Sequence, residues 1–112
     1  MLNKSTRYYS RNQEKKVAKS VGGKVVPNSG ATPFQKGDVS TKDWLIECKT
    51  RTKRCSSMTI KEDWLDKNSE EAFAMGKHNS ALCFDFGPDT NRYYVVSEKL
   101  FNELCHYLET QI

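Results

Sequence analysis

The sequence predicts an α/β protein built on one mixed β-sheet, and three observations lead to this class. Segments with helical periodicity alternate with short extended segments in the order α-β-β-β-α-β-β-α. The chain has 112 residues, which is the size of one domain, so we expect a single domain over residues 1–112. Its apolar fraction of 37% and charged fraction of 29% are typical of a globular protein with one modest core.

The first helix is predicted over residues 10–21. Residues 10–13 have the form of a capping box, and two glycines follow Val21. Its inward stripe contains Glu14 beside Val17, although a buried carboxylate needs a partner or a metal ion. Two interpretations remain open: Glu14 points into an active site, or it pairs with a lysine at the helix edge. Residues 1–9 are interpreted as a flexible basic arm.

The segment from Gly37 to Lys49 contains two extended runs, residues 38–40 and 44–49, joined by a polar turn. With a period of two, one face of the second run carries Trp44, Ile46 and Cys48, and the other carries Leu45, Glu47 and Lys49. If the runs pair as a hairpin, Asp38 and Glu47 lie close together beside Lys49. Two carboxylates next to an amine predict a Mg²⁺ site suited to phosphodiester cleavage.

The remaining elements are predicted from similar signals. A basic loop follows Lys49, and a capping box at residues 59–62 opens a helix that runs to about Met75 and ends at Gly76. Residues 81–86 and 92–96 form two strands around a turn. Ser97 then caps a final amphipathic helix.

Charge is divided unevenly along the chain. Residues 1–61 hold 14 Lys and Arg against 4 Asp and Glu, whereas residues 62–112 hold 4 against 10. The basic half contains the predicted hairpin, which suits a polyanionic substrate such as nucleic acid. The candidate contacts are the basic residues near the predicted site and in the arm: Arg7, Arg11, Lys36, Arg51, Lys53 and Arg54.

The cysteine pattern and the lack of long apolar runs bear on location and metal chemistry. The four cysteines have no CxxC spacing and there are only two histidines, which disfavours a zinc site. No apolar stretch has the length of a membrane span, and the N-terminus lacks the apolar centre of a signal peptide. We therefore expect a reducing cytoplasm, that of the host if the chain is encoded by a phage.

An ordered set of residues resembles a known motif. Asp38, an eight-residue gap and then Glu47-Cys48-Lys49 resemble the PD-(D/E)XK nuclease superfamily. Glu14 in the first helix and Ser29 in the loop before the aspartate resemble its archaeal-type Holliday-junction resolvases. The resemblance covers about residues 10 to 96, and Gly37 stands where the family has a proline.

The resemblance implies a restriction-endonuclease-like core and a Mg²⁺-dependent DNA endonuclease in which Mn²⁺ can substitute. The implied catalytic residues are Glu14, Asp38, Glu47 and Lys49. Metal ligands would be Asp38, Glu47 and the carbonyl of Cys48, with Glu14 as a further candidate. Ser29 either contacts a phosphate or is an ordinary turn serine.

The implied substrate is a branched DNA, above all the four-way junction. Such a junction is two-fold symmetric, so paired cuts by a one-site chain require a homodimer. Two alternatives remain: another nuclease of the superfamily that nicks DNA or cuts flaps or duplexes, and a non-catalytic nucleic-acid-binding module on the same fold.

Overall fold

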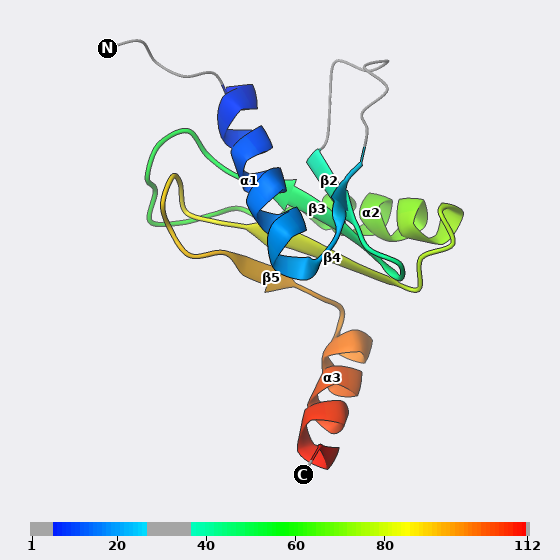
Figure 1. Cartoon of the computed structure of the whole chain (residues 1–112). Helices are drawn as coiled ribbons and strands as arrows, with labels where there is room; N and C mark the ends of the chain where they lie inside the picture. The colour runs from blue at the N-terminus through cyan, green and yellow to red at the C-terminus, as the bar shows by residue number, and fades with distance from the viewer. Residues whose placement is uncertain (1–5, 27–36, 112) are drawn as a thin grey trace.

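A computed structural model describes residues 6–26 and 37–111 of the chain. It confirms an α/β protein with an open mixed sheet of five strands and three helices (Figure 1). The elements are α1 (Thr6–Val21), β1 (Lys24–Val25), β2 (Gly37–Ser40), β3 (Trp44–Lys49), α2 (Glu62–Ala74), β4 (Asn79–Phe84), β5 (Tyr93–Val95) and α3 (Glu98–Thr110). No helix in the described part has the length and apolarity needed to cross a membrane.

The strands lie in the sheet in the order β1-β2-β3-β4-β5. All neighbouring pairs are antiparallel except β3 and β4, which are parallel and are joined by the crossover that contains α2. The predicted hairpin between β2 and β3 is confirmed. Its turn is closed by Thr41, whose hydroxyl oxygen accepts a hydrogen bond of 3.0 Å from the Trp44 backbone N–H.

The two faces of the sheet are covered by different helices (Figure 1). α1 packs on β1, β2 and β3, while α2 packs on β3 and β4. The core under α1 contains Ile46 and Cys48 with Trp44 packed against it, which confirms the predicted inward face of β3. The opposite face is covered as well, because Leu45 and Leu82 are fully buried on the α2 side.

α1 begins four residues earlier than predicted. The helix starts at Thr6, so Ser10 is an internal residue and its predicted role as a cap is wrong. No glycine or proline interrupts residues 6–9, and the helix continues through the part of the predicted flexible arm that the structure describes. The predicted end is correct: Gly22 has a φ of 69°, and the Gly23 N–H donates to the Ala18 carbonyl at 2.8 Å.

α2 also differs at its start. It begins at Glu62 after Lys61, so the predicted cap at Thr59 is wrong. The acidic side chains of Glu62 and Asp63 lie in the first turn, where they interact favourably with the helix dipole. Gly76, with a φ of 73°, ends the helix as predicted. Met75, where the helix was predicted to end, is the residue directly after Ala74 and is 46% exposed.

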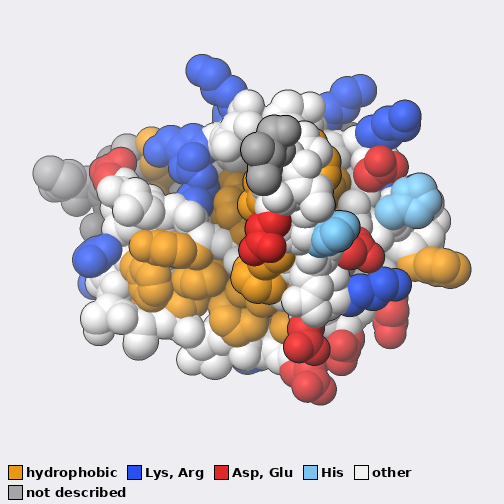
Figure 2. Space-filling model, turned by 90° about the horizontal axis from the view of Figure 1, so that it is seen from below, with side chains coloured by type: hydrophobic (Ala, Val, Ile, Leu, Met, Phe, Trp, Pro, Cys, Tyr) orange, Lys and Arg blue, Asp and Glu red, His pale blue; other side chains and the backbone are white. Residues whose placement is uncertain are grey.

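α3 is capped by Ser97 as predicted, since the Leu100 N–H donates to the Ser97 hydroxyl oxygen at 3.1 Å. Beyond its first turn the helix projects away from the sheet (Figure 1). Leu100 is buried, but Phe101 and Leu108 on the same apolar stripe are 57% and 71% exposed. Seen from below, hydrophobic side chains gather on the face that carries β5 and α3 (Figure 2).

Candidate functional site

The β2–β3 hairpin places two acidic residues side by side. Asp38 and Glu47 are directly opposite in the antiparallel register, so both side chains point to the same face of the sheet. Residues in this relationship have Cβ atoms about 5 Å apart, and their carboxylates can therefore reach one ion. The pair that the period-two pattern predicted is present.

Lys49 completes this arrangement. Its Nζ lies 3.6 Å from Glu47 Oε1, and Glu47 is fully buried whereas the lysine side chain is 25% exposed. The same Nζ lies 4.3 Å from the centre of the Trp64 ring on α2, a distance typical of a cation–π contact. The ammonium group is thus held between a buried carboxylate and an aromatic face. Trp64 was not among the residues predicted for the site, because its contact with Lys49 joins two separate elements, α2 and β3.

Glu14 approaches the same end of β3 from the other layer. It lies on α1 with 9% of its surface exposed, which confirms its place on the buried side of the helix. Burial raises the pKa of the Cys48 thiol, and the charges of Cys83, Glu14, Asp38 and Glu47 raise it further. All three carboxylates therefore lie close enough to the Cys48 thiol to act on it electrostatically.

The donor set fits a hard cation that keeps part of its own water shell. Within residues 6–26 and 37–111, no three His, Cys, Asp or Glu side chains form a complete metal-binding group. Mg²⁺ is usually held by only one or two carboxylates, with water and substrate phosphate as further ligands. The Asp38–Glu47 pair supplies that number of protein ligands.

The backbone directly after Lys49 is anchored by groups that the sequence did not reveal. Gln13 Nε2 donates to the Lys49 carbonyl oxygen at 2.6 Å and to Asp85 Oδ2 at 3.1 Å. Asp85 Oδ1 accepts from the Thr50 hydroxyl at 2.6 Å and from the Gly87 N–H at 3.1 Å. A single aspartate at the end of an apolar strand was the signal that could have indicated this network.

The predicted nucleic-acid contacts are placed only in part. Arg51, Lys53 and Arg54 are exposed in the loop after β3, and Arg11 is exposed on α1. Arg7 lies within α1, whereas Ser29 and Lys36 fall outside the described residues. The basic loop is held near its middle, because the Cys55 N–H donates to the Phe86 carbonyl at 2.9 Å.

The geometry contains a two-carboxylate and lysine arrangement, but similarity searches add nothing to it. No family model, curated protein or solved structure matches this chain. The interpretation of the site therefore depends on its residues alone.

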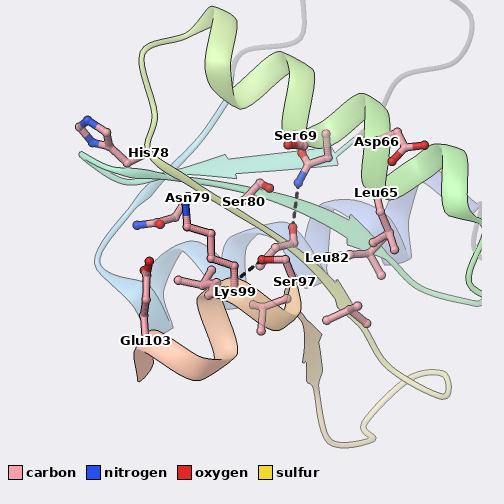
Figure 3. A pocket seen from close by; sticks show the side chains of 15 residues that line it. Leu65, Asp66, Ser69, His78, Asn79, Ser80, Leu82, Ser97, Lys99 and Glu103 are labelled. Carbon is pink, nitrogen blue, oxygen red and sulfur yellow. Dashed lines mark hydrogen bonds between the residues drawn. The ribbon is translucent and has the colours of Figure 1, made fainter. Parts of the chain in front are cut away.

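A cavity of larger volume lies elsewhere. It measures about 370 Å³ and is bounded by α2, β4 and the first two turns of α3, with Asp66, Lys99 and Glu103 among its lining residues (Figure 3). Asn68 at its inner wall is occupied in bracing the sheet, since its side-chain N–H donates to the Ala81 carbonyl at 3.0 Å. None of its lining residues belongs to β2 or β3, so size alone does not identify the candidate site.

Proposed function

We propose that this protein is a Mg²⁺-dependent DNA endonuclease with a restriction-endonuclease-like core, and that branched DNA such as the four-way junction is its substrate. One observation carries the proposal: Asp38 faces Glu47 across the hairpin, with the Lys49 ammonium 3.6 Å from Glu47. The order of the elements and the basic first half of the chain support it.

Each residue of the site has a defined task in this proposal. Asp38 and Glu47 would hold Mg²⁺, with the Cys48 carbonyl as a third ligand and Glu14 binding directly or through water. The bound ion would supply an activated water molecule and stabilise charge on the phosphate. Lys49, fixed by Glu47 and Trp64, would orient the attacking water or offset the negative charge that develops on the phosphate oxygens.

The test compares Asp38→Asn, Glu47→Gln and Lys49→Ala with the unmodified chain. Substrates are a labelled four-way junction, a linear duplex and a single strand, each with Mg²⁺, with Mn²⁺ and without a divalent ion. Loss of a metal-binding carboxylate should slow cleavage by about a thousandfold, equivalent to about 4 kcal/mol of barrier. Lys67→Ala is the control, because this lysine is 61% exposed on α2 and pairs with Asp63.

The substrate preference decides between branches of the proposal. Cleavage of the junction in preference to the duplex supports resolution, whereas equal cutting of all duplexes supports another nuclease role. Unchanged cleavage in all three variants would overturn the nuclease proposal. Tight DNA binding without Mn²⁺ binding in calorimetry would instead favour the non-catalytic module.

Junction resolution also requires a second copy of the chain. Two symmetric cuts need two active sites, and each chain has one Asp38–Glu47 pair. We therefore propose a homodimer. Light scattering coupled to size-exclusion chromatography measures its mass, and a monomer in the presence of junction DNA would exclude paired cutting.

A further inference from the structure

A second cavity lies next to the candidate site, on the α1 side of the molecule. It measures about 270 Å³ and is lined by residues of α1 between Tyr8 and Lys16, by the residue after β3 and by the turn between β4 and β5. Gln13, Thr50 and Asp85, which anchor the backbone after Lys49, are among its lining residues. The cavity therefore lies at the same end of β3 as Lys49, beside the backbone of that residue, while the Lys49 side chain lies on the α2 side of the sheet.

The inner wall of this cavity is polar and already organised. Gln13 and Asp85 are 4% and 7% exposed, so both are nearly completely buried. The Asp85 carboxylate accepts hydrogen bonds from Gln13, Thr50 and Gly87. Because these three donors occupy most of its acceptor positions, the cavity does not resemble a cation site.

The outer part of the cavity combines aromatic rings, an amide and cations. Tyr8 and Tyr9 both line it, with ring centres 5.3 Å apart and nearly perpendicular planes. Tyr8 is 40% exposed, so part of the residue is accessible to a ligand. Asn12 lies one helical turn further along, and Lys16 and Arg92 add positive charge.

These features match the parts of a nucleotide. Stacking on an aromatic ring is open to every base, because every base has a π-face. The Asn12 amide can donate to and accept from a base edge. Lys16 and Arg92 can attract the neighbouring phosphates, although Asp89 partly offsets their charge.

We propose that this cavity binds an unpaired nucleobase of the DNA strand next to the cleaved phosphate. The proposal rests on the proposed function, because the position of the cavity beside Lys49 and Thr50 matters only if a strand passes the site. A branch point supplies bases that have lost their stacking partners. Capture of one such base would let the protein distinguish branched DNA from an uninterrupted duplex.

The experiment measures binding to a labelled four-way junction in EDTA, so that no cleavage occurs. Single abasic sites are moved through the nucleotides around the branch point, and affinities are measured for the unmodified chain, Tyr8→Ala and Tyr8→Phe. Tyr8→Ala should weaken binding to the intact junction about tenfold or more. On the junction whose abasic site removes the captured base, Tyr8→Ala should weaken binding little further. Tyr8→Phe should bind every junction like the unmodified chain.

Tyr107→Ala is the matched control, because this tyrosine is 59% exposed on α3 and does not line the cavity. Thermal unfolding of each variant shows whether the fold is retained. The proposal would be overturned if Tyr8→Ala lowered the affinity equally for the intact junction and for every abasic junction. It would also be overturned if Tyr8→Ala did not lower the affinity at all.

A parallel cleavage assay with Mg²⁺ separates this proposal from the nuclease proposal. If the protein cleaves DNA but the effect of Tyr8→Ala does not depend on any abasic site, only the proposal of base binding in the cavity is overturned. If the effect of Tyr8→Ala depends on one abasic site but no DNA is cleaved, base binding is supported and the nuclease proposal is not. Absence of DNA binding overturns both.

Discussion

Two regions depart in opposite directions from the usual pattern of buried apolar and exposed charged side chains. One is the end of the sheet around the β2–β3 hairpin, and the other is the C-terminal helix α3. Glu47 and Asp85 are 0% and 7% exposed near the hairpin, whereas Phe101 and Leu108 are 57% and 71% exposed on α3. Burying carboxylates is costly unless other groups bind them, and exposing large apolar side chains forfeits hydrophobic stabilisation. The first region thus keeps buried carboxylates that require partners, and the second leaves large apolar side chains exposed to solvent.

The difference can be tested most strongly at Asp85. Asp85→Ala removes the acceptor of hydrogen bonds from Gln13, Thr50 and Gly87. Leaving such buried donors without partners should lower the free energy of unfolding by about 3 to 5 kcal/mol. Chemical denaturation monitored by circular dichroism measures this change.

Asp89→Ala is the control for that prediction, because Asp89 is an exposed residue of the neighbouring turn. Its effect should be only about 1 kcal/mol, because its φ of 61° lies in the left-handed region, which alanine adopts less readily than aspartate. Equal stability of both variants would show that the buried network contributes little, and would remove the contrast between the two regions.

The hairpin was readable from the sequence because all of its signals are local. A polar turn and a period-two pattern lie within thirteen residues, and together they predict the Asp38–Glu47 pairing that the structure shows. The Gln13–Asp85 contact spans 72 positions and depends on how α1 lies across the sheet. No local pattern encodes such a contact, so the network and its cavity were missed.

The C-terminal helix shows a second limit of sequence reasoning. The spacing of Leu100, Phe101, Leu104 and Leu108 correctly predicts an amphipathic helix. The pattern does not state whether the apolar stripe covers the chain's own sheet or another molecule. Similarly, serine and threonine are common outside caps, which explains why Ser10 and Thr59 misplaced the starts of α1 and α2.

The apolar stripe of α3 gives the next prediction, which depends on the proposed homodimer. Leu104 lies at the middle of α3, so antiparallel packing of two such helices about a two-fold axis brings it against its own copy. Leu104→Arg should therefore weaken dimerisation about a hundredfold, since it removes the apolar contact twice. Sedimentation equilibrium measures the dissociation constant.

Phe73→Arg provides the matched control, because Phe73 is 86% exposed on α2 and is distant in sequence from α3. It should leave the dissociation constant unchanged. If both substitutions dissociate the dimer equally, or neither does, the apolar stripe of α3 is not the pairing surface. A monomeric Leu104→Arg chain that retains single cuts would separate assembly from catalysis.

The smallest expected effect is a change in the pH dependence of stability, at the contact between β4 and β5. Cys83 and Tyr94 lie directly opposite each other in the antiparallel register of β4 and β5. Burial raises the pKa of Cys83 to about 11 and that of Tyr94 to about 12. Since both folded-state pKa values exceed their ordinary values of 9.0 and 10.0, the unfolded chain loses these protons first as the pH rises.

Stability should therefore be fully present below pH 9 and should fall between about pH 9 and 12. Tyr94→Phe should flatten the part of this decline above pH 10, because the phenol can no longer ionise in either state. Urea unfolding at a series of pH values measures the slope. Tyr107→Phe on the exposed face of α3 is the control and should leave the slope unchanged, since an accessible phenol ionises at a similar pH in both states. An identical slope for Tyr94→Phe and the unmodified chain would show that the Cys83–Tyr94 contact does not govern the alkaline limit of the fold.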